Sequence, residues 1–357
     1  MKPEMEPKVV NSSEIVEKKT FIGWFKRKWK NDPLFSILIA LIIMVILQTL
    51  TLGFDYGSFG EWFQAWTNNW INILRNNAGI GIVALGMTFV IMTGGIDLSV
   101  GSTLVITGAF TMYLLDTGAQ GILGSVGVTG VPAIILTVLL VMAFGYLLGS
   151  LIGVTITKGM VPPFIATLGA MMIFRSVTQH FAQGYNTTVP TEFLQISSFK
   201  IGNYMIMPII YWIIIAAILY YVSKRTIFGR QIIAVGSNER AAKLSGVNVN
   251  KVKLRVYGLM GLLVSIAAII QVSRIGSMDF SNAGRGMEMD AIAAAVVGGT
   301  NMLGGRGFIL GTVYGMLIIA VMNNLLNLFG VPPFLREAFK GVIVIVAVLM
   351  QRKQKTA

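Results

Sequence analysis

Ten apolar segments follow one another along the chain, separated by Gly, Pro or charged residues. The first runs from Leu34 to Leu52, and the others are centred on residues 78–93, 100–115, 131–156, 163–181, 204–222, 254–273, 287–299, 307–329 and 338–350. Backbone groups inside a bilayer must be satisfied within the chain, and these segments lack the strict alternation of half-buried strands. The pattern therefore predicts an all-α, polytopic membrane protein with about ten transmembrane helices, some of them broken or re-entrant.

Polar ends flank this apolar region and divide the chain into three parts. We expect residues 1–33 to be a basic tail, 34–350 the membrane domain and 351–357 a second polar tail. Trp24 and Trp29 lie among the basic residues of the first tail, as is typical of aromatic side chains at the headgroup layer. A cleaved signal peptide is not expected, because the first apolar run is too long and starts too late.

The composition narrows the chemistry. Only 12% of the 357 residues are charged and 55% are hydrophobic, whereas soluble domains carry about 25% charged residues. Cysteine is absent and His180 is the single histidine, which excludes disulfide frameworks, zinc clusters and thiol nucleophiles. We therefore expect no catalytic residue, no metal site and no cofactor in this chain, and an intramembrane enzyme is the weakest functional hypothesis.

The net charge of +13 can reflect affinity for nucleic acid or the enrichment of Lys and Arg in cytoplasmic loops of membrane proteins. With the amino terminus in the cytoplasm and ten crossings, 21 of the 28 basic residues lie on the cytoplasmic side. This distribution explains the charge without nucleic acid. It places both termini and the longest inside loop, residues 223–253, in the cytoplasm.

A first break in the helices is predicted between two short apolar runs, 77–93 and 100–115. At 17 and 16 residues, both fall below the roughly 20 residues that an upright span needs. We expect their connection to lie at the cytoplasmic interface or slightly inside it. Two roles stay open for it: satisfying the helix ends where water is absent, or lining an aqueous passage.

Four residues are candidates for making this break or for lining the translocation path. Gly94 and Gly95 can adopt positive φ and end the first helix. Asp97 or Ser99 can cap the free N–H groups of the second helix.

A second break is predicted where Gly298, Gly299 and Asn301 repeat the spacing of the two glycines and Asp97. The apolar run before it is too short to cross the bilayer alone, so the break is expected inside the membrane unless that helix begins earlier. These three residues are therefore further candidates for the helix break or the translocation path.

Glycines spaced by four residues occur in two further places, where they predict close helix packing and no chemistry. They are Gly145, Gly149 and Gly153, and Gly307, Gly311 and Gly315.

Charges inside the predicted spans are few. Arg175 lies in the fifth span, and Glu288 and Asp290 open the eighth. Because the two acids sit near helix ends, snorkelling or capping is their expected role. No convincing proton path results, which argues against a secondary carrier.

The inside loop contains a predicted helix, Glu239–Leu244, which Ser237 or Asn238 can cap and Gly246 can end. Either the loop is a basic connector, or this helix docks another protein.

Three stretches resemble the signatures of the ribose-type permease family, the membrane subunits of bacterial ABC importers for monosaccharides. They are GMTFVIMTGGIDLSVGS, TIFGRQIIAVGSNERAAKLSGV and EMDAIAAAVVGGTNMLGGRG. The similarity runs from about Asn77 to Met350. It implies an ABC importer permease in the bacterial inner membrane, working as a homodimer or heterodimer of permeases with two ATPase subunits and an extracellular or periplasmic sugar-binding protein.

The resemblance also assigns a coupling role within the inside loop. Glu239, Arg240, Ala241, Ala242 and Gly246 resemble the family's coupling loop, which contacts the ATPase. This chain has no P-loop sequence, so ATP-Mg is expected on the partner ATPase.

The resulting hypothesis is a permease that imports a monosaccharide, with a ribose-like sugar as first choice. A permease of the same family for nucleosides or for a furanose-like signal is the alternative, and a secondary carrier is a weaker one.

Overall fold

The structure, a computed structural model, describes residues 25, 28, 33–117, 121–182, 188–332, 335–343 and 345. Its helices are α3 (Pro33–Leu52), α4 (Phe59–Met92), α5 (Val100–Leu115), α6 (Ile122–Ser125), α7 (Gly130–Thr157), α8 (Pro163–Ala182), α9 (Thr191–Ser198), α10 (Met207–Arg225), α11 (Ile227–Ser237), α12 (Glu239–Leu244), α13 (Val249–Ile275), α14 (Met287–Val297) and α15 (Ile309–Leu328). Residues 335–343 are also helical. The strands β1 (Lys200–Ile201) and β2 (Tyr204–Met205) pair as a small antiparallel hairpin.

The predicted all-α membrane fold is confirmed, since each of the first nine apolar segments lies on a helix. Among the described residues, six helices are long and apolar enough to cross a bilayer: α3, α4, α7, α10, α13 and α15. The count of ten spans stays a prediction. Both predicted tails fall outside the described residues except at positions 25, 28 and 33, as does most of the last segment.

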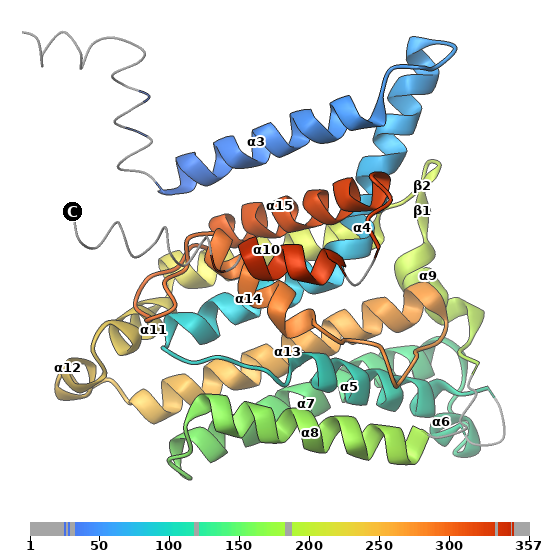
Figure 1. The fold of residues 1–357 in the computed structure, drawn as a ribbon. Coiled ribbons are helices and arrows are strands. Elements are labelled where there is room, and N and C mark those ends of the chain that lie inside the picture. Colours follow the sequence, from blue (N-terminus) through green and yellow to red (C-terminus); the bar gives the residue numbers. More distant parts are fainter. Residues whose placement is uncertain are drawn as a thin grey trace, which may run out of the picture.

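The length of α4 differs from the prediction. This helix has 34 residues and starts at Phe59, where the Ser58 hydroxyl accepts a hydrogen bond from the backbone N–H of Glu61 at 3.2 Å. The expected start near residue 77 was wrong because asparagine and tryptophan residues interrupt the apolar pattern without breaking the helix. Figure 1 shows its first turns rising beside the end of α3, where the Trp66 indole donates to the Thr49 hydroxyl at 3.0 Å.

The spaced glycines pack helices closely, as predicted. On α7, a Cβ at Gly149 would collide with the carbonyl oxygen of Tyr257 on α13, and one at Gly145 would lie 2.5 Å from the Gly261 oxygen. On α15, a Cβ at Gly311 would collide with the Gly298 oxygen at the end of α14. These contacts bring α13 and α14 against their neighbours at backbone distance.

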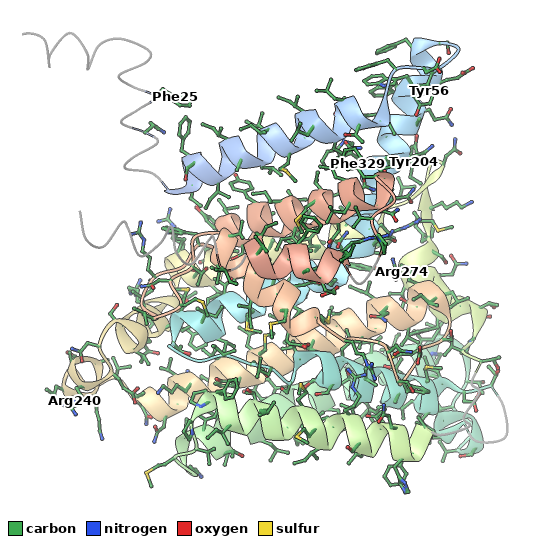
Figure 2. All side chains as sticks on the ribbon, in the orientation of Figure 1. Phe25, Tyr56, Tyr204, Arg240, Arg274 and Phe329 are labelled. Atoms are coloured by element: carbon green, nitrogen blue, oxygen red, sulfur yellow. The ribbon has the colours of Figure 1, made fainter. Side chains whose placement is uncertain are left out.

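The long helices run roughly side by side, which gives the bundle two ends (Figure 1). We call the end that carries α11 and α12 the α12 end, and the one that carries α6, α9 and the β-hairpin the α9 end. Figure 2 shows Arg240 at the tip of the α12 end, with Tyr56, Tyr204 and Arg274 toward the opposite end.

Candidate functional site

The first break is deeper than predicted. Residues 94–99 leave the α12 end of α4 as an extended segment and return to the middle of the bundle, where α5 begins (Figure 1). Asp97 is only 3% exposed and Ser99 is fully buried. The segment is therefore irregular backbone inside the membrane domain, and not a short interfacial loop.

The glycines, Asp97 and Ser99 of this segment have roles that differ in part from those predicted. Gly94 has the expected positive φ of 79°, but Gly95 does not; a Cβ there would lie 2.5 Å from the Tyr257 hydroxyl oxygen, so Gly95 provides room. Ser99 occupies the N-cap position of α5 without a side-chain capping bond. Instead, Asp97 Oδ1 accepts from the backbone N–H and the hydroxyl of Ser99, at 2.9 and 2.6 Å. The carboxylate thus orders the residue before the helix.

The second break is a compact loop at the α12 end. Gly299 has φ 86° and follows Gly298, the C-cap of α14. Asn301 holds the loop together: its backbone N–H donates to the Arg306 oxygen at 2.9 Å, and its Oδ1 accepts from the Leu303 N–H at 3.1 Å. All three predicted residues therefore lie at a real helix break, and the Asn301 side chain is used inside the loop.

Sequence reasoning missed a third irregular segment. Residues 276–286 leave the α9 end of α13 and run back into the bundle, so that α14 also begins in its middle (Figure 1). There a Cβ at Gly101 of α5 would collide with the Gly284 carbonyl oxygen. The amino-terminal ends of α5 and α14 consequently meet, each helix leading away toward a different end. Gly284 and Gly286 both adopt positive φ; as glycines they indicate a turn in the sequence, but not that the segment returns into the bundle.

The intramembrane charges have partners that the sequence did not indicate. Arg175 donates to the Ala283 carbonyl oxygen of this third segment at 2.8 Å. Asp290 forms an ion pair with Lys340, with Nζ and Oδ1 2.9 Å apart. Because a paired charge in the membrane costs far less than an isolated one, these contacts explain how both charges are tolerated.

The segment between α10 and α13 folds as two helices. Asn238 caps α12, since its Oδ1 accepts from the Ala241 N–H at 3.0 Å, and Gly246 follows the helix with φ 82°. The predicted helix Glu239–Leu244 is therefore confirmed. Glu239 is further held by Lys253 of α13 through an ion pair of 2.7 Å.

The faces of α12 differ in exposure. Ala242 is 5% exposed and packs against its own chain, whereas Leu244 is 90% exposed. Arg240 and Ala241 also face outward, and Figure 2 shows Arg240 projecting from the tip. The outward surface thus offers the apolar side chain of Leu244 and the cations Arg240 and Lys243 to a partner.

A backbone contact joins this loop to both predicted breaks. Gly236, in the last turn of α11, lies so close to the end of α4 that a Cβ there would collide with the Met92 carbonyl oxygen. The same oxygen accepts from the Gly305 N–H in the second break at 2.9 Å. A displacement of α11 must therefore act on α4 and on the loop before α15.

Comparison with known proteins identifies the family of this chain. Residues 69–348 match the family described as the permease component of the branched-chain amino acid transport system. The chain belongs to this family of transport permeases. It is 39% identical to the ribose import permease protein RbsC of Escherichia coli (strain K12) over 338 residues, 93% of this chain and 97% of that protein.

Other relatives extend the similarity. The ribose import permease protein RbsC of Bacillus subtilis (strain 168) is 41% identical over 91% of this chain and 93% of its own length. The fructose import permease protein FrcC of Rhizobium meliloti is 32% identical over 94% and 89%. No solved structure matches the chain. The resemblance to sugar import permeases that the sequence motifs indicated is thus confirmed.

Proposed function

We propose that this chain is the membrane-spanning permease subunit of an ATP-driven importer that moves a monosaccharide, with a ribose-like sugar as first choice. The observation that carries this proposal is the 39–41% identity to ribose import permeases over more than nine-tenths of the chain. The fructose import permease at 32% identity widens the substrate class to other monosaccharides.

The placement of charge supports a proposed orientation. Basic residues concentrate at the α12 end: Lys158, Lys224, Arg225, Arg230, Arg240, Lys243, Lys251, Lys253, Arg255 and Arg306. The positive-inside rule makes this the cytoplasmic end, and the α9 end then faces a sugar-binding protein outside. The chain lacks native cysteine, so Ser245→Cys and Asn203→Cys, both exposed, report one end each. An impermeant thiol reagent should label intact cells only at position 203, and the reverse pattern would overturn the orientation.

The ATPase is expected to bind at α12. A side chain such as Leu244, 90% exposed beside outward charges, is suited to fill a groove on a partner, while Arg240 orients the contact. Because Gly236 touches both α4 and the loop before α15, movement of the docked helix would reach the membrane helices through this contact. ATP-Mg is expected to bind to the partner ATPase, since no P-loop occurs in this sequence.

The coupling role is tested with one pair of charge reversals. Arg240→Glu should lower sugar uptake by about tenfold or more, by removing a charge contact with the ATPase. Lys251→Glu is the matched control, because it makes the same charge change on an exposed residue at the start of α13. Equal uptake by both variants, with no cross-link from Leu244→Cys to the ATPase, would leave α12 without a coupling role.

Transport itself is tested by uptake into cells that lack the gene and into the complemented strain. Labelled ribose, fructose, galactose, cytidine and leucine are offered separately, the last because of the family description. We expect one of the monosaccharides to be taken up only by the complemented cells, with uptake abolished by ATP depletion and not by a protonophore. Uptake of leucine alone, or collapse with the protonophore, would contradict the proposal.

A further inference from the structure

A cavity opens where the amino-terminal ends of α5 and α14 meet. Its volume is about 340 Å³, which lies in the range of roughly 300–1,000 Å³ of small-molecule sites. The polar side chains of its wall are Ser102 of α5, Arg175 and Ser176 of α8, and Arg285 and Glu288 at the start of α14. Two methionines of α8, Met171 and Met172, complete the wall with apolar surface.

The cavity lies at depth in the membrane domain. α14 has 11 residues and is therefore about 16 Å long, so its first residue lies that far from its last residue, where the loop to α15 begins. This length is about half of a hydrocarbon core of about 30 Å. α5 has 16 residues and leads about 24 Å from the cavity to the α9 end. A solute in the cavity would therefore be midway along a crossing.

The two helix ends are available to a ligand. Neither α5, which follows Ser99, nor α14, which follows Gly286 at φ 73°, has a side-chain capping bond. At α14 the Met287 N–H donates to the Gly284 carbonyl oxygen at 3.3 Å, so the helix ends offer the cavity chiefly the positive ends of their two dipoles. The polar wall described above is a second feature that points to a ligand.

The cavity wall carries charges of both signs, from Arg175, Arg285 and Glu288. The Arg175 guanidinium feels the charges of Arg285, Glu288 and Asp279, which makes two cations and two carboxylates. Because both signs are present, the wall lacks the strong single-sign field that would select an ion, and a neutral solute fits it better.

The face that carries the cavity is unsuited to lipid. Arg285 is exposed and Met172 is 63% exposed on the same rim. A charged side chain facing hydrocarbon at the bilayer centre costs at least about 2.5–3.5 kcal/mol. This face therefore borders water or another copy of the permease, either of which would give a solute access.

We propose that this cavity is a binding station for a neutral, polyhydroxylated solute on its way through the membrane. The assignment rests on the proposed function and deepens it, because it names the permease residues that touch the sugar. Glu288 and Arg175 can hold neighbouring hydroxyls as acceptor and donor, and Ser102 adds a hydroxyl. The methionines offer apolar surface to the C–H face of the ring.

Protection from labelling tests the station without requiring transport. Ser176→Cys places the only thiol of the chain on an exposed position of the cavity wall. In membrane vesicles, a sugar at twice its dissociation constant should slow labelling of this thiol about threefold by mass action. Leucine should not slow it, and Asn203→Cys at the α9 end should show no protection by any solute.

Uptake supplies the second measurement. Glu288→Gln should lower the maximal rate of uptake about tenfold, because it weakens a charged hydrogen bond to the solute. The half-saturating concentration should not change, since the binding protein sets it. Glu192→Gln is the matched charge removal on α9, outside the cavity wall, and it should leave the protection of the thiol at position 176 unchanged.

The outcomes separate the two proposals. Protection at position 176 together with the loss in Glu288→Gln supports the station. If the wild-type protein imports a monosaccharide but that sugar neither protects the thiol nor needs Glu288, the station is overturned and the proposed function stands. If no monosaccharide is imported by the wild-type protein, the proposed function itself fails.

Discussion

Two glycine contacts each join a helix to an irregular segment of the bundle, and they differ in what surrounds them. In the middle, Gly101 meets Gly284 beside a cavity of about 340 Å³ with a charged wall. At the α12 end, Gly236 and Gly305 meet Met92 backbone to backbone, with a hydrogen bond of 2.9 Å from Gly305 to the Met92 oxygen.

The difference separates two mechanical requirements. A station for a solute needs space and polar groups, so helix ends are left uncapped beside it. Transmission of motion needs stiffness, so at the α12 end backbones touch where any added atom would collide. We therefore expect substitutions at the α12-end contact to be costlier than those in the middle, and a reversal of this order would refute the comparison.

The largest effect is expected for Gly236→Ala. The added methyl group collides with the Met92 carbonyl oxygen, and both backbones are fixed in helices, so the free energy of unfolding should fall by about 3 kcal/mol or more. Thermal unfolding of the purified permease measures this loss. Gly169→Ala on α8 is the control, because a Cβ there meets nothing within 4 Å. An unchanged unfolding temperature for Gly236→Ala would remove the proposed rigid contact.

A smaller loss is expected for Gly101→Ala. Its methyl group collides with the Gly284 oxygen, but residue 284 lies in a loop that can shift, so we expect about 1–3 kcal/mol. The same methyl group would lie 3.0 Å from Glu288 Oε2, so uptake should fall further than stability alone explains. Uptake normalised to the amount of folded permease tests this, and a normal ratio would contradict it.

Asp97→Ala removes the acceptor of both Ser99 bonds. These bonds are buried, so the expected cost is about 1–2 kcal/mol. Asp97→Asn keeps an oxygen acceptor and should lose less. Equal unfolding temperatures for the two variants would show that the charge, and not the hydrogen bonding, is what matters at this position.

The smallest effect is expected for Gly94→Ala. A Cβ there meets nothing within 4 Å, so only the positive φ of 79° opposes it, at about 1 kcal/mol. Asn tolerates this conformation better, so Gly94→Asn should unfold at a higher temperature than Gly94→Ala. The opposite order would argue against backbone strain as the cause.

Much of the fold was determined by local features of the sequence. Continuous apolar runs predicted α7, α13 and α15, because a helix in a bilayer satisfies its own backbone and needs only apolar side chains around it. The cap of α12 at Asn238 and the turn at Gly94 were also predictable, since both depend on bonds and dihedral angles within a few residues.

Depth and partners were decided only by the tertiary structure. No local pattern in the sequence shows that residues 276–286 return into the bundle. Nor does any local pattern show that Arg175 donates to Ala283 or that Asp290 pairs with Lys340. Likewise, Gly95 and Gly236 are required by Tyr257 and Met92, which lie far from them in the sequence. Local propensity fixes which residues form a helix, whereas close approach and charge pairing arise from packing between distant segments.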